Sequence, residues 1–65
     1  MIGTVVAVTP SGLAFVRPDG ENSNILARKD TFHRCGFDLQ AGDRVSCRIA
    51  RERDGRLLIT KIEPA

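Results

Sequence analysis

Two runs of residues with strand character, 2–8 and 13–17, are separated by a turn sequence, and this arrangement most constrains the fold. The first run is rich in β-branched side chains. The second alternates between two faces: Leu13, Phe15 and Arg17 against Ala14 and Val16. Period-two alternation is typical of a strand with one buried face, and the intervening Thr9-Pro10-Ser11-Gly12 favours a turn. We therefore predict an antiparallel hairpin, and we expect function on its exposed face.

Three further strands are predicted, each bounded by turn residues. The segment Pro18–Asn22 combines a φ-fixing proline with Asp and Gly, which indicates a turn. A short third strand then covers about Asn24–Arg28, and a fourth, with clear alternation, covers Asp43–Arg51. Asp54-Gly55 favours a hairpin turn with positive φ. The fifth strand follows from Arg56 to about Glu63 and is ended by Pro64.

Five short strands with a long connection after the third predict one all-β domain over residues 1–65, a small Greek-key barrel of the OB type. Residues 29–32 can form one helical turn, and residues 33–41 read as a loop. Closure of the barrel would leave few exposed strand edges. The apolar sides of the strands predict the core: Val5, Val16, Ile25, Val45, Cys47 and Ile49.

The charge balance is mildly basic, with a net charge of +2. Arginine dominates, because lysine occurs only at positions 29 and 61. Arginine suits contacts with phosphates and bases, but a solvated surface of mixed charge is the simpler interpretation of this composition. No apolar run reaches the roughly 18 residues of a membrane span, and no secretory signal is present, so we expect a cytoplasmic protein without a membrane partner.

No pair of residues in the sequence has a recognised spacing for catalysis or metal binding. His33 is the only histidine and has no second ligand at metal spacing. Cys47 lies on the predicted buried face, and Cys35 lies in the loop as a free thiol, although a disulfide between them stays open. No nucleophile or phosphate-loop motif occurs. We therefore expect a protein that is not an enzyme and binds no metal or cofactor.

Five segments match known motifs in order along the chain: residues 3–8, 11–16, 18–19, 25–29 and 42–47. The motifs are, in the same order, G-x-V-K-W-F, K-G-F-G-F-I, P-D, V-F-V-H-F and G-x-x-V-x-F. The register holds over nearly the whole chain, which therefore resembles the cold-shock domain family. The glycine-led segments at residues 3 and 42 are similar also to the small bacterial initiation factor built on an OB-fold.

The resemblance implies binding of single-stranded nucleic acid, RNA ahead of DNA, on the exposed face of the first three strands. In that family the bases stack on aromatic side chains. Phe15 keeps its motif position and Phe37 matches a loop aromatic, whereas Ala7, Val8, Leu13 and Leu26 replace aromatics. Arg28 stands where the family has His, and Lys29 where it has Phe. The predicted contact residues are Leu13, Phe15, Arg17, Leu26, Arg28, Lys29 and Phe37.

Each of these residues also has a structural interpretation. Phe15 can be a core residue instead of a stacking platform, and Phe37 can be a lid over the core. Arg28 and Lys29 can be solvated charges. Loss of three or four aromatic platforms, at about 1–3 kcal/mol each, predicts weak and salt-sensitive binding.

An apolar patch is the basis of a second functional hypothesis. If Val6, Val8, Leu13 and Leu26 share the exposed face, they replace the family's aromatic rings with aliphatic surface. Exposed apolar patches usually mark partner surfaces, so the domain would form a homodimer or bind a protein partner through this patch.

Overall fold

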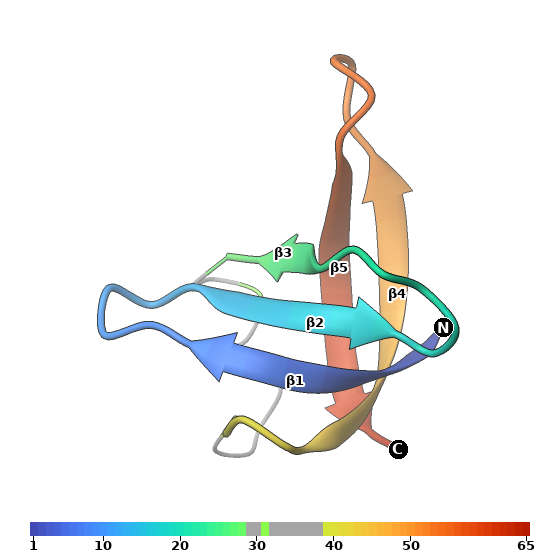
Figure 1. Cartoon of the computed structure of the whole chain (residues 1–65). Helices are drawn as coiled ribbons and strands as arrows, with labels where there is room; N and C mark the ends of the chain where they lie inside the picture. Colours follow the sequence, from blue (N-terminus) through green and yellow to red (C-terminus); the bar gives the residue numbers. More distant parts are fainter. Residues whose placement is uncertain (29–30, 32–38) are drawn as a thin grey trace.

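The computed structural model describes residues 1–28, 31 and 39–65, and these described residues form five strands. They are β1 (Ile2–Val8), β2 (Ala14–Pro18), β3 (Ile25–Ala27), β4 (Arg44–Arg51) and β5 (Leu57–Pro64) (Figure 1). All five agree with the predicted strands to within one residue at each end. Apart from Thr31, the helical turn predicted for residues 29–32 lies outside the described residues, as do His33 and Cys35.

The strands close into a barrel in the order β1-β2-β3-β5-β4. Neighbouring strands are antiparallel except β3 and β5, which are parallel and pair through Leu26 with Leu58. Closure occurs between β1 and β4, where Gly3 lies opposite Val45. This order, with its single parallel contact, is that of a small OB-type barrel, and it confirms the predicted fold class.

The barrel interior is filled by small and β-branched side chains. Its buried hydrophobic residues are Val5, Ala14, Val16, Ile25, Ala27, Val45, Cys47, Ile59 and Ile62. Five of the six predicted core residues are among them, but Ile49 is only partly buried and packs against the cluster from its edge. The two isoleucines of β5, which are among the largest fully buried side chains, were not predicted.

Two irregularities in strand register interrupt the alternation of buried and exposed residues in β1 and β5. A register shift lies between Val5 and Ala7, so that Val6 and Ala7 are both exposed and Val8 packs against the core. The condition that Val8 shares an exposed face with Val6 is therefore not met. A second shift follows Arg48, where Ile49 pairs with Ile59. It separates the two buried residues of β5 by three positions, which a strict period of two does not predict.

Gly3 allows β1 and β2 to approach closely. A Cβ atom at this position would lie 2.6 Å from the main-chain oxygen of Arg17 and 3.0 Å from Cγ1 of Val16. The strands can be this close only because residue 3 has no side chain. Gly3 therefore fixes where β2 lies and, with it, where Phe15 and Arg17 stand on the outer surface.

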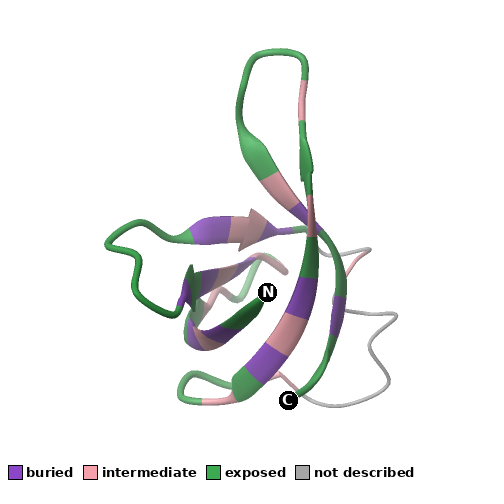
Figure 2. Ribbon diagram, turned by 90° about the vertical axis from the view of Figure 1, so that its right-hand side faces the viewer, coloured by how far each residue is buried: buried purple, intermediate pink, exposed green. Residues whose placement is uncertain are grey.

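The β4–β5 hairpin extends well beyond the other strands, as Figures 1 and 2 show. Its turn is closed by a hydrogen bond from the Glu52 amide to the Arg56 carbonyl at 2.8 Å. Gly55 has φ of 90°, so the predicted Asp-Gly turn is confirmed. Figure 2 shows buried residues along the barrel part of the strands and exposed residues at the hairpin tip. No helix in the described part of the chain is both long and apolar enough to cross a membrane.

Candidate nucleic-acid interface

The outward side of β1, β2 and β3 is the surface on which the sequence predicts function. We call it the front face. Its described side chains are Thr4, Val6, Ala7, Phe15, Arg17 and Leu26. The orientation of β2 is clear, because Ala14 and Val16 are completely buried and the residues between and after them point outward. Phe15 is thus a half-buried residue of the outer surface, and the interpretation of Phe15 as a core residue does not hold.

An apolar row crosses the front face at the level of Phe15. Phe15 pairs with Ala7 on one side and with Leu26 on the other. Leu26 in turn pairs with Leu58 of β5, so the row continues beyond the first three strands. Leu58 was not among the predicted site residues, because its place beside Leu26 depends on a parallel pairing between strands distant in sequence. An alternating pattern in β5 alone could not have revealed it.

A polar row lies next to the apolar one, toward the start of β1. Arg17 is exposed and lies opposite Thr4. Its Nε donates a hydrogen bond to the side-chain oxygen of Asn24 at 3.2 Å, a neutral partner that leaves the guanidinium charge available. A hollow of about 280 Å³, which includes Thr4, Val6 and Arg17 in its lining, borders this row. The front face therefore offers a cation beside an apolar surface.

Arg44 borders the same row but is held in a bidentate ion pair. Its two terminal nitrogens donate to the two carboxylate oxygens of Asp19, each at 2.7 Å, and one of them also reaches the hydroxyl of Thr4 at 3.0 Å. The hydrogen bonds from Arg44 lower the pKa of Asp19 below its ordinary value. Arg44 therefore connects β4 to the loop after β2 and is less available to a ligand than Arg17.

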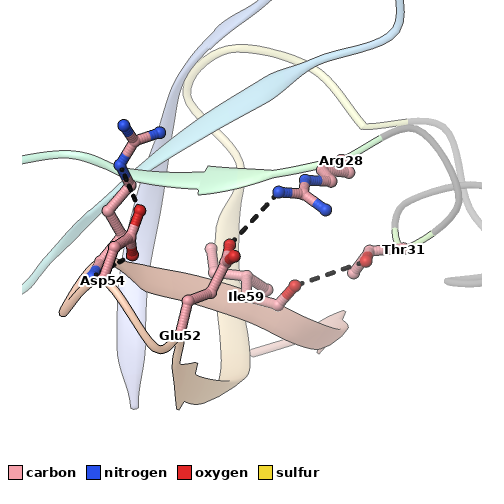
Figure 3. Close-up of polar contacts among 6 residues, drawn as sticks. Arg28, Thr31, Glu52, Asp54 and Ile59 are labelled. Carbon is pink, nitrogen blue, oxygen red and sulfur yellow. Dashed lines mark hydrogen bonds and ion pairs between the residues drawn. The ribbon is translucent and has the colours of Figure 1, made fainter.

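Arg28, just after β3, is paired with Glu52 of the β4–β5 hairpin. The guanidinium nitrogen and the carboxylate oxygen are 3.2 Å apart (Figure 3). Both side chains are exposed to solvent, 59% for Arg28 and 37% for Glu52. Such a pair contributes about 0–1 kcal/mol to stability and can be exchanged for another anion. Figure 3 also shows Thr31, whose hydroxyl donates to the Ile59 carbonyl and holds the chain after β3 against β5.

Five of the seven predicted contact residues can be placed. Phe15, Arg17 and Leu26 are neighbours on the front face. Leu13 and Arg28 are each one residue beyond the last pair of β2 and β3, Ala14 with Ala27, and so lie at one end of that face. Leu13 is half-buried and Arg28 is exposed. Lys29 and Phe37 lie outside the described residues.

Other reactive groups in the described residues are not arranged for chemistry. Cys47 is buried, and burial raises the pKa of its thiol, so it is protonated at neutral pH. Within residues 1–28, 31 and 39–65, no three His, Cys, Asp or Glu side chains gather at a spacing that could hold a metal ion.

Comparisons of the chain with protein-family models, with curated proteins and with solved structures gave no match. The case for function therefore rests on the barrel and on the side chains of its surface.

Proposed function

We propose that this barrel is a non-catalytic protein that binds single-stranded RNA or DNA, weakly and with strong salt dependence, through its front face. The observation that carries the proposal is the outward position of Phe15 between a leucine and an exposed arginine, Leu26 and Arg17. An aromatic ring on a sheet surface offers a platform for a base, and a nearby cation attracts the phosphate that follows that base.

The apolar row favours unpaired bases over a duplex. A stacked base needs its face free, which single strands provide and paired helices do not. Leu26 and Leu58 extend the apolar surface beside Phe15 but have no π-system. They can contact a base edge or sugar, whereas stacking falls to Phe15 and to the planar guanidinium groups of Arg17 and Arg28.

Binding should be weak because the described front face has one aromatic platform. Base stacking on an aromatic side chain contributes about 1–3 kcal/mol, so a single platform leaves much of the affinity to phosphate contacts. Those contacts act through counterion release and weaken as salt rises. Two arginines, Arg17 and Arg28, flank the platform, which fits a shallow, salt-sensitive interface.

A titration of labelled single-stranded RNA and DNA at two salt concentrations tests the proposal. Phe15→Ala should weaken binding by about 1–3 kcal/mol and leave the salt slope nearly unchanged. Phe15→Leu is the matched control for apolar contact, because it keeps aliphatic surface and removes the ring. If Phe15→Leu binds as tightly as the wild type, stacking does not contribute.

Arg28→Ala is the complementary variant for charge. Removal of one phosphate contact should lower the salt slope by about 0.7 for a single strand. If Arg28 stacks on a base instead, affinity falls while the slope stays nearly constant. A wild-type protein that binds no mixed-sequence strand at low salt would refute the proposal.

The apolar row also favours a second candidate function, a protein-interaction module that forms a homodimer or docks on a protein. Val6 is 39% exposed beside this row and adds to the apolar surface that a partner would cover. Apolar association is little affected or strengthened by salt, in contrast to phosphate binding. Leu26→Asp and Leu13→Asp should then abolish self-association, as measured by sedimentation, in a protein that shows no affinity for nucleic acid.

A further inference from the structure

We propose that Arg48 and Lys61 bind phosphodiester groups of a strand that extends past the front face. This inference rests on the proposed nucleic-acid binding and adds a second contact surface to it. Arg48 of β4 and Lys61 of β5 lie directly opposite one another. The adjacent pair, Cys47 with Ile62, is buried in the barrel, so Arg48 and Lys61 point outward. Both are exposed.

Two like charges directly opposite on a sheet destabilise the strand pair unless an anion lies between them. The outer surface around this pair is suited to such an anion. A hollow of about 210 Å³ is lined by Ser46, Arg48, Lys61 and Glu63 together with Cys47. The Ser46 hydroxyl adds a hydrogen-bond donor beside the two cations. A tetrahedral phosphate group, with several acceptor oxygens, matches this set of donors.

The carboxylate present at the site does not neutralise both cations. Glu63 is 2.8 Å from Lys61, and this contact lowers the pKa of Glu63, with a smaller contribution from Arg48. Arg48 itself has no carboxylate within ion-pair distance among the described residues. The cluster therefore keeps a net positive charge, and its position is fixed by the register shift that directly follows Arg48.

This surface is separate from the front face. β4 and β5 complete the barrel on the side away from β2, and in Figure 1 they run behind β1–β3. A short strand that covers Phe15 would not reach Arg48, whereas a longer one that continues around the barrel would. OB-type domains bind about 4–16 nucleotides. Oligonucleotides at the two ends of this range therefore serve as the short strand and the long strand.

The experiment compares a 4-nucleotide and a 16-nucleotide single strand of mixed sequence on the full chain. Arg48→Gln should leave the short strand unaffected and weaken the long one about eightfold at 50 mM salt and about threefold at 200 mM, as expected for one lost phosphate contact. Glu63→Gln should strengthen binding of the long strand only, because it removes the carboxylate that competes for Lys61.

Arg53→Gln is the matched control, since it removes the same charge from the exposed hairpin tip. If Arg48→Gln weakens both lengths equally, or no more than Arg53→Gln does, the inference is overturned. If Phe15→Ala weakens both lengths while Arg48→Gln weakens neither, the proposed function stands and the second surface fails. If the wild type binds neither length, both fail. A loss confined to the long strand supports the second surface.

Discussion

In the free protein Arg28 forms an ion pair with Glu52. This carboxylate competes with a phosphate group for the guanidinium group of Arg28. The pair with Glu52 reaches from the hairpin to the residue after β3, as Figure 3 shows. A phosphate that binds Arg28 must displace this carboxylate. The affinity measured for a nucleic acid therefore includes the cost of breaking the ion pair between Arg28 and Glu52.

Glu52→Gln should strengthen binding of single-stranded nucleic acid by about twofold to fivefold at low salt, because an exposed ion pair contributes little and its loss frees Arg28. The control is Asp54→Asn, which makes the same charge change on the same hairpin but at the partner of Arg56. Equal gains from the two variants, in a fluorescence titration, would mean that net charge alone acts.

The Asp19–Arg44 pair predicts a stability difference that depends on pH. The pKa of Asp19 in the folded protein lies below its ordinary value of 3.8. The pair therefore stabilises the fold fully above that value, and its contribution disappears as pH falls through the lowered folded pKa. Asp19→Asn should have a lower urea midpoint than the wild type at neutral pH, and the two midpoints should converge toward pH 2. A gap that persists undiminished at pH 2 would exclude this ion pair as its source.

At the scale of the strands, the close approach of β1 and β2 at Gly3 predicts that one added methyl group lowers the stability of the fold. Gly3→Ala would place a Cβ atom 2.6 Å from a main-chain oxygen of β2, and backbone cannot give way as a flexible side chain can. We expect a loss of about 1–3 kcal/mol in the free energy of unfolding, typical of overpacking. Chemical denaturation measures it, with Ser46→Ala on the outer side of β4 as control. An unchanged midpoint would mean that β1 and β2 can separate at no cost.

The strands also show what the sequence can and cannot predict. Alternation and turn residues predict all five strands, the outward side of β2 and most of the core, because each depends on neighbouring residues. The positions of Val8 and of the two buried isoleucines of β5 follow instead from register shifts, which depend on the partner strand. Leu58 lies beside Leu26 because β3 and β5, which are distant in sequence, pair in parallel. Lys61 lies opposite Arg48 because a register shift interrupts the β4–β5 hairpin. Neither the parallel pairing nor the register shift leaves a local sequence pattern from which these surfaces could be predicted.

For the whole molecule, we expect a chain of 65 residues to have a single hydrophobic core and a small free energy of unfolding. Native proteins are stable by about 0.05–0.15 kcal/mol per residue, which gives this chain roughly 3–10 kcal/mol. The described hydrophobic core consists of nine buried residues contributed by all five strands. We therefore expect unfolding in a single transition, without a partly folded barrel.

Val45→Ala tests whether the stability of the whole fold depends on this single core. Val45 has no exposed surface and lies on β4 opposite Gly3, at the closure of the barrel. The cavity left by two missing methyl groups should cost about 1–3 kcal/mol, a large part of the total, and the urea midpoint should fall with the slope of the transition unchanged. Val6→Ala is the matched control, since it makes the same chemical change at a residue that is 39% exposed. Equal losses from the two variants would contradict the observed register of β1 and β4, whereas a second transition in Val45→Ala would contradict folding as one unit.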